Sequence, residues 1–231
     1  MSSNRRAVPV LAVVFFGAAA LGQDAAKKDE APKSASTDDT AKKLDALLAD
    51  LGKKLGAVKT LRSRFEQKKR LEVFEDVVTS EGTLAVAVPD KLRWEYVKPV
   101  KSVLTVNGKQ AQRERTSRKG ETTRRTYVLD DEPVTAITAQ QVFLWSRGDF
   151  SKARESYDLS LVSEKPVVVK ATPKAERMRE IVASIELTFG DDRRSLAAVS
   201  IVEKGGAKTT ITFLDVEIDP ALPEALFKIE K

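Results

Sequence analysis

Apolar and polar residues alternate along most of this 231-residue chain, and this alternation constrains the fold more than any other feature. The longest run covers nine residues and consists of Ile181, Ala183, Ile185, Leu187 and Phe189. Successive side chains of a β-strand point to opposite faces of its sheet, so such a run predicts a strand with one buried face. Shorter runs recur from Leu61 to Phe213 and predict several more strands, one of which ends with Tyr127 and Leu129.

Two stretches depart from the alternation and predict helices. Residues 40–57 carry leucines at helical spacing and predict an amphipathic helix. A helix this short gains most of its stability by packing, so its apolar stripe must cover something apolar. Residues 133–156 predict one or two short helices interrupted near Gly148; their apolar positions include Ile137, Leu144, Trp145 and Phe150.

The order of these elements favours an antiparallel sheet. Strands and helices do not alternate regularly, which argues against a parallel, doubly wound sheet. Asn107-Gly108 and Gly205-Gly206 are hairpin-turn signals, and a change of apolar phase before Val216 predicts a β-bulge. We therefore predict a mainly β fold with some helix, a single curved antiparallel sheet whose apolar face is covered by the two helical segments.

The composition excludes several kinds of chemistry. The chain contains no Cys and no His, so it has no disulfide, no thiol nucleophile, no His general base and no His-ligated zinc. Asp130-Asp131 and Asp191-Asp192 are adjacent carboxylates, but neighbours on a strand point to opposite faces, so we interpret them as turn residues. We predict that the protein is not an enzyme and binds no metal or cofactor. A hydrolase would need two carboxylates within about 10 Å of each other in a cleft.

The first 22 residues have the features of a secretory signal peptide. Arg5 and Arg6 precede an apolar run over 8–21, and Ala20-Leu21-Gly22 places small residues at a cleavage site. The alternative is a membrane anchor, but a run of about 14 residues is shorter than the roughly 20 that span a bilayer. We therefore expect residues 1–22 to be removed on export.

The rest of the chain divides into a linker and one domain. Residues 23–40 are rich in Ala, Lys, Asp, Ser and Thr without apolar periodicity, which predicts a flexible linker. Residues 41–231 show no internal repeat and no second break in composition, so we predict one domain. Loss of the signal peptide lowers the formal charge from +6 to +4. For an exported protein, which we place in the periplasm, anionic lipid head groups or glycans are then more sensible counterparts than nucleic acid.

A series of short motifs gives the chain a resemblance to a known family. In order they are Phe65-Glu66-Gln67, Gly82-Thr83-Leu84, Pro89-Asp90-Lys91-Leu92-Arg93-Trp94-Glu95-Tyr96, Pro99, Val106-Asn107-Gly108, Thr172-Pro173, Ile181 to Phe189, Gly206 to Phe213, and Phe227. This order resembles the outer-membrane lipoprotein carrier protein family (LolA type) over about residues 41–231.

The resemblance implies both a fold and a function. The family fold is an incomplete, strongly curved antiparallel β-barrel closed by helices. Its members carry the acyl chains of lipoproteins through the periplasm from an inner-membrane ABC transporter to an outer-membrane acceptor. The expected function is therefore a periplasmic carrier for lipoproteins or a similar lipid, acting as a monomer. The alternative is a binding or sensor module of the cell envelope on the same fold, which holds a protein partner and transports no lipid.

Such a carrier needs inward-facing apolar residues and a cover that opens. The candidate lipid-binding residues are Phe65, Leu84, Val86, Trp94, Tyr96, Leu104, Ile185, Leu187, Ile211 and Phe213. The candidate lid residues are Leu47, Leu51, Ile137, Leu144 and Trp145. The alternative is that all of them form an ordinary core without a cavity.

The chain departs from the family pattern at Val88 and in the segment 109–125. Val88 stands where the family often has an arginine that holds the lid closed. Gln110, Gln112 and Arg113 replace aromatic residues, and residues 109–125 contain seven Lys or Arg against two Glu. This basic segment either docks an acidic partner or anionic head groups, or is a solvated hairpin whose charges prevent edge pairing. Arg93 is either a polar anchor at the rim or, preferably, the partner of Glu95 on the outer face.

Overall fold

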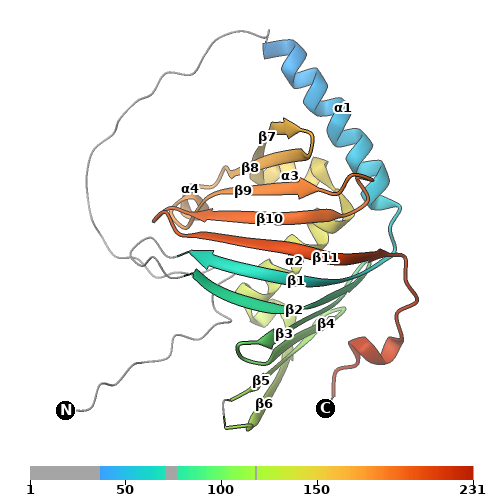
Figure 1. The fold of residues 1–231 in the computed structure, drawn as a ribbon, viewed down its shortest axis with the longest axis vertical. Coiled ribbons are helices and arrows are strands. Elements are labelled where there is room, and N and C mark those ends of the chain that lie inside the picture. Colours follow the sequence, from blue (N-terminus) through green and yellow to red (C-terminus); the bar gives the residue numbers. More distant parts are fainter. Residues whose placement is uncertain (1–36, 71–76, 118, 231) are drawn as a thin grey trace, which may run out of the picture.

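Eleven antiparallel strands form one sheet in the computed structural model, which describes residues 37–70, 77–117 and 119–230 (Figure 1). The strands are β1 (Thr60–Arg70), β2 (Val77–Ala87), β3 (Lys91–Lys98), β4 (Ser102–Asn107), β5 (Gln110–Thr116), β6 (Thr122–Val128), β7 (Tyr157–Glu164), β8 (Val167–Pro173), β9 (Val182–Phe189), β10 (Leu196–Glu203) and β11 (Lys208–Ile218). The helices are α1 (Thr37–Gly56), α2 (Pro133–Arg147), α3 (Phe150–Ser156) and α4 (Glu176–Arg179), with the 3-10 turns η1 (Leu129–Asp131) and η2 (Glu224–Phe227).

The sheet is two meanders joined by their first and last strands. Its order is β6-β5-β4-β3-β2-β1-β11-β10-β9-β8-β7, and β1 pairs with β11 in the middle. In the described part of the chain the edge strands β6 and β7 do not pair with each other, so the sheet curves without closing. The helices α2 and α3 lie behind the sheet in Figure 1. The predicted fold class, a single curved antiparallel sheet covered by helices, is confirmed.

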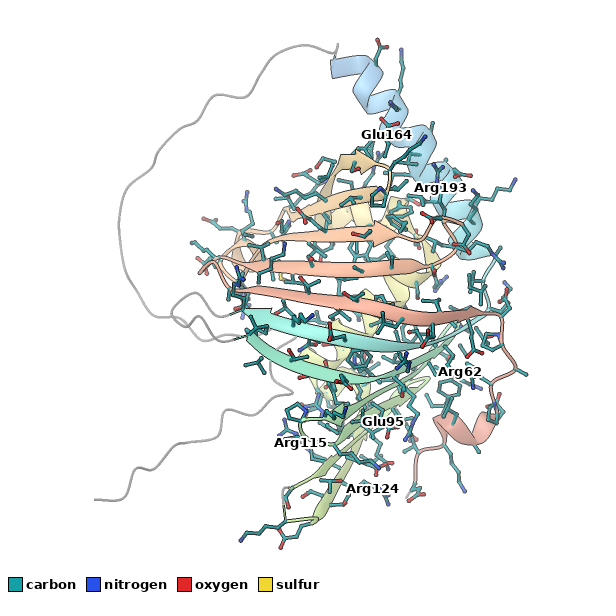
Figure 2. The ribbon with its side chains drawn as sticks, in the orientation of Figure 1. Arg62, Glu95, Arg115, Arg124, Glu164 and Arg193 are labelled. Carbon is teal, nitrogen blue, oxygen red and sulfur yellow. The ribbon has the colours of Figure 1, made fainter. Side chains whose placement is uncertain are left out.

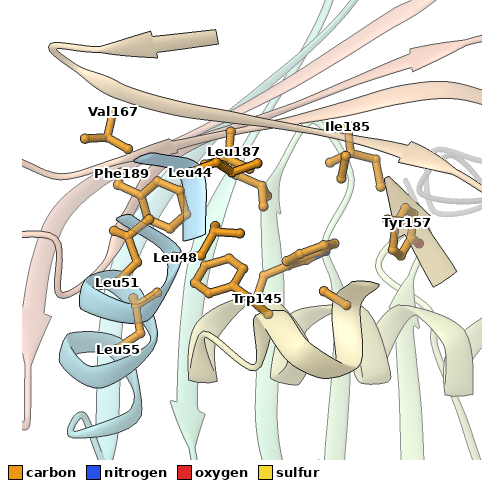
Figure 3. Packing of buried hydrophobic residues seen from close by; sticks show 14 of the residues in the cluster. Leu44, Leu48, Leu51, Leu55, Trp145, Tyr157, Val167, Ile185, Leu187 and Phe189 are labelled. Carbon is orange, nitrogen blue, oxygen red and sulfur yellow. The ribbon is translucent and has the colours of Figure 1, made fainter. Parts of the chain in front are cut away.

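The helices bury two separate parts of the concave face. The first cluster lies under α1 and α3, where leucines of α1 and Trp145 of α2 point toward β9 (Figure 3). The second lies under α2, where Ala139, Val142 and Phe143 pack against strands β1 to β5 and β11. Helix α2 therefore packs on both halves of the sheet, whereas α1 packs on only one of them.

A glycine pair allows α1 and α2 to approach closely. Helix α2 ends at Gly148, whose φ of +62° is a backbone conformation that residues other than glycine rarely adopt. A Cβ at Gly148 would lie 2.9 Å from the Leu55 Cβ and 3.0 Å from the Gly52 Cα. The predicted interruption of the helix near Gly148 is confirmed, and the absence of a side chain there lets the α2–α3 corner rest directly on α1.

Two details of the strands differ from the sequence-based expectation. Strand β9 begins at Val182, and Ala183 is exposed, although the alternation placed it on the buried face. The register with β10 shifts between Val202 and Glu203, which changes the face that the start of β9 presents. The expected strand through Leu129 ends at Val128 because η1 begins there.

The bulge expected before Val216 is present. The register between β1 and β11 shifts between Arg62, opposite Glu217, and Arg64, opposite Leu214. Asp215 has a φ of +50° at this point. The extra residue changes the phase of β11 as the sequence indicated.

Parts of the predicted N-terminal organisation lie outside the described residues. These are the signal peptide, 1–22, and residues 23–36 of the linker. The last four residues of the predicted linker, 37–40, belong to α1. None of the described helices is both long enough and apolar enough to pass through a membrane.

Candidate functional site

An apolar hollow of about 90 Å³ lies between the concave face of the sheet and α2. Both halves of the sheet contribute to it, together with one face of α2 and one residue of α1. The lining residues are Leu55, Leu61, Leu84, Val86, Trp94, Thr138, Gln141, Val142, Trp145, Ser146, Ile185, Arg194, Ser195, Leu196, Val199, Ile201, Ile211, Phe213 and Val216. Pockets for small molecules measure about 300–1,000 Å³, so the hollow is smaller than a typical ligand pocket.

The roof of the hollow is one face of α2. Thr138 precedes Gln141 and Val142 by three and four residues, and Trp145 follows them by four and three, the spacing that brings side chains onto one side of a helix. One polar contact of this helix comes from the Tyr157 hydroxyl, which donates to the Gln141 Oε1 at 3.1 Å. Burial raises the pKa of Tyr157, so this hydroxyl stays protonated at neutral pH.

An aromatic cluster stiffens the floor beside the hollow. The ring of Phe65 meets Trp94 and Tyr96 edge-on at centroid distances of 5.6 and 5.1 Å. A Cβ at Gly82 would lie 2.6 Å from the Phe65 ring, so only glycine leaves room for that ring on β2. The Tyr96 hydroxyl donates to the Gln67 Oε1 at 2.8 Å, and burial raises the Tyr96 pKa. Motifs far apart in the sequence thus pack together as one unit.

The structure divides the ten predicted lipid-binding residues into two groups. Six line the hollow: Leu84, Val86, Trp94, Ile185, Ile211 and Phe213. The other four lie in the surrounding core, with Phe65, Tyr96 and Leu104 under α2 and Leu187 under α1. Leu187 is fully buried and lies on the same face of β9 as Ile185, so it is a core residue beside the hollow.

The predicted lid residues lie mostly away from the hollow. Trp145 lines it, whereas Leu47, Leu51, Ile137 and Leu144 belong to or pack against the cluster under α1. Sequence reasoning missed Val142 as a roof residue. Its spacing of three residues before Trp145 is the signal that could have identified it, because the two lie on the same face of α2.

Three polar contacts hold the first turn of α2 to strands β5 and β6. Arg113 Nη2 donates to the Thr135 Oγ1 at 2.9 Å, and the Tyr127 hydroxyl lies 3.2 Å from the same oxygen. Arg125 pairs with Glu132 at 2.7 Å, with its own side chain 73% exposed. An exposed ion pair contributes only about 0–1 kcal/mol, so the Arg125–Glu132 pair adds little to the attachment of α2.

The position expected to latch the lid makes a different contact. Val88 is partly buried and packs against the cluster under α2. It also borders a surface cleft together with Lys59, Arg147 and Asp149. Val88 therefore makes an apolar contact at the position where the resemblance led us to expect an arginine.

The rim of the hollow carries a single charge. Among the described residues that line the hollow, only Arg194 is ionisable, and it pairs with Asp219 at 3.0 Å. Asp219 also accepts a hydrogen bond from the Lys59 backbone N–H at 2.7 Å. The Lys59 and Thr60 backbone N–H groups and Arg194 lower the pKa of Asp219. The hollow therefore offers an apolar surface without carboxylates that could exchange protons.

The acidic residues considered earlier lie outside the hollow. Asp130 and Asp131 are in η1, and the Asp192 carboxylate accepts a hydrogen bond from the Arg194 backbone within the β9–β10 turn. Arg93 pairs with Glu95 at 3.1 Å along β3, in a groove on the other side of the sheet from the hollow. Within the described ranges, no group of three or more Asp or Glu could hold a metal ion.

The comparison with protein families decides the identification. The family described as outer membrane lipoprotein carrier protein LolA matches residues 56–230. The chain belongs to the LolA family. The match begins at the end of α1 and covers all eleven strands of the LolA-type sheet together with α2 and α3.

Two relatives carry the same description. The outer-membrane lipoprotein carrier protein of Pseudoalteromonas translucida (strain TAC 125) is 22% identical over 175 residues, which are 75% of this chain and 78% of that one. The outer-membrane lipoprotein carrier protein of Dechloromonas aromatica (strain RCB) is 28% identical over 179 residues, 74% and 76% of the two chains. The crystal structure of a LolA superfamily protein from Nitrosomonas europaea covers 80% of this chain and 97% of its own, at 9% identity and a TM-score of 0.41.

Proposed function

We propose that this LolA-family protein is a periplasmic carrier that binds the acyl chains of lipoproteins, or of a similar lipid, in the hollow under α2. The observation that supports this most is the hollow itself, because apolar residues from both halves of the sheet meet there beneath a single helix. In this proposal residues 1–22 are a cleaved signal peptide, 23–40 a linker and 41–231 the carrier domain. The monomeric carrier takes cargo from an inner-membrane transporter and delivers it to an outer-membrane acceptor.

The energetics suit a carrier that must also release its cargo. Each buried methylene contributes about 0.8 kcal/mol, so one long acyl chain gains on the order of 10 kcal/mol. The present hollow holds only part of such a chain, so binding requires α2 to move away from the sheet. When the cargo leaves, α2 buries its own apolar face again, and this return competes with the lipid.

A second candidate is an envelope binding module that holds a protein partner. The small volume of the hollow favours it, because a module of that kind needs no room for an acyl chain. The two candidates make opposite predictions for the response of the hollow to lipid.

The two tryptophans of the chain test the carrier proposal directly. Trp94 and Trp145 are the only tryptophans in the sequence, and both line the hollow from opposite sides. Titration with a synthetic lipidated peptide is expected to change the tryptophan emission in a saturable way, because the acyl chains displace the roof from the floor. The same peptide without its acyl chains is the control. Equal responses to both peptides would favour the protein-binding module.

A further inference from the structure

The arginines of the β5–β6 hairpin divide between the two faces of the sheet. Neighbouring strand residues point to opposite faces. Ala111 belongs to the buried cluster under α2, so Arg113 and Arg115 lie on the same concave face. Arg124 is paired in register with Glu114 and lies on the convex face. In Figure 2, Arg115 and Arg124 lie on opposite sides of the hairpin.

The concave arginines continue the floor of the hollow. Across the strands, Trp94 is opposite Leu104, Leu104 is opposite Arg113, and Arg113 is opposite Arg125. Trp94 lines the hollow and Leu104 is 7% exposed. Adjacent strands are about 4.8 Å apart, so the backbone of Arg113 lies roughly 10 Å from that of Trp94. The surface thus changes from apolar to cationic within two strands.

The arginines of the hairpin also differ in how their charges are compensated. On the convex face Arg124 pairs with Glu114 at 3.3 Å and with Glu230 at 2.6 Å. On the concave face Arg125 pairs with Glu132 at 2.7 Å. Among the described residues, Arg113 donates to the neutral hydroxyl of Thr135 and has no hydrogen-bond partner for its buried Nε. Arg115 is exposed and, in the described part of the chain, forms no ion pair. A buried donor without an acceptor is unfavourable and is satisfied well by an anion.

We propose that Arg113 and Arg115 bind the phosphate of an anionic lipid whose acyl chain occupies the hollow. The proposal rests on the carrier function and extends its cargo to lipids with a phosphate head group. A phosphate accepts several hydrogen bonds from guanidinium groups, and a fork of N–H donors matches its geometry. The apolar floor and the cationic edge then complement the two ends of one amphiphile.

The head group is also linked to the roof of the hollow. Arg113 holds the first turn of α2 through Thr135, which is 1% exposed. A phosphate is a stronger acceptor for a guanidinium than a neutral hydroxyl. Binding of the head group therefore draws Arg113 away from Thr135 and releases the end of α2 that covers the hollow.

The experiment compares two lipids that share one acyl chain. Palmitoyl lysophosphatidic acid and monopalmitoylglycerol are titrated below their critical micelle concentrations, and the emission of Trp94 and Trp145 is recorded. The phosphate lipid is expected to bind about tenfold more tightly or better, a difference typical of a charge-assisted hydrogen bond. The preference is expected to fall as the salt concentration rises.

Three variants test which arginines cause the preference for the phosphate lipid. Arg113→Gln and Arg115→Gln are each expected to remove most of it, and the matched change Arg124→Gln on the convex face is expected to keep it. Because Arg113 also contacts α2, the exposed Arg115 provides the test that does not depend on the lid. Urea unfolding of all three variants confirms that each is folded.

The outcomes separate this inference from the carrier proposal. Equal binding of the two lipids, or a preference that survives both concave variants, would overturn the head-group site and leave lipid binding intact. Failure of both lipids to bind would overturn both. Glycerol 3-phosphate and an acidic peptide carry negative charge but no acyl chain. If either competes as strongly as the phosphate lipid, the head-group proposal is also overturned, since the acyl chain would then add nothing to the affinity.

Discussion

Replacing Val142 with phenylalanine is expected to abolish most acyl-chain binding while leaving the protein folded. Val142 is a partly buried residue of α2 that lines the roof of the hollow. The larger side chain adds four carbon atoms to a space of about 90 Å³. If it excludes about four methylenes of the ligand at 0.8 kcal/mol each, binding loses about 3 kcal/mol, or roughly a hundredfold in affinity.

The matched control for this variant is Val162→Phe. Val162 is 54% exposed on β7, far along the sheet from the hollow. Both variants keep the two native tryptophans, so the same titration with a lipidated peptide applies. Urea unfolding is expected to show little change for either, because Val142→Phe fills empty space. Wild-type affinity in Val142→Phe would mean that lipid does not enter under α2.

Replacing Leu187 with aspartate is expected to unfold the protein. Leu187 is fully buried in the cluster under α1, opposite Val199 of β10 and Val169 of β8. Removing a buried leucine side chain costs about 2–5 kcal/mol, and placing an unpaired carboxylate there adds a further penalty. The sum approaches the entire stability of a typical domain, about 5–15 kcal/mol.

Circular dichroism and urea unfolding measure this effect, with Val162→Asp as the exposed control. The control is expected to change the free energy of unfolding by no more than about 0.5 kcal/mol. A cooperative transition of Leu187→Asp at the wild-type midpoint would show that Leu187 is not part of a packed core. Both Leu187 and Ile211 are predicted lipid-binding residues; the structure places Ile211 at the hollow and Leu187 in the packed cluster under α1.

The strands and the general fold could be predicted from the sequence, because the alternation of apolar and polar residues indicates directly which residues share a face of the sheet. The run ending at Ile185, Leu187 and Phe189 is an example, since all three are buried in β9. The break at Gly148 was accessible for the same kind of local reason, since no side chain fits its backbone conformation.

The hollow was only partly accessible, because its walls come from strands that are distant in sequence. Alternation cannot say that Ile185 of β9 and Trp94 of β3 face the same space. It also cannot say which half of the sheet a helix covers. For this reason Leu51 is among the predicted lid residues, although it belongs to α1 and packs in the cluster away from the hollow. The concave position of Arg113 became visible only through the register of β4, β5 and β6.

Native mass spectrometry of the protein purified from its own cell envelope tests the central claim most directly. The claim is that α2 moves and that the hollow then takes an acyl chain. The account predicts a population heavier than the bare chain by the mass of an acylated molecule, which organic extraction removes. A spectrum that contains only the bare chain, from protein that is still folded, would contradict it.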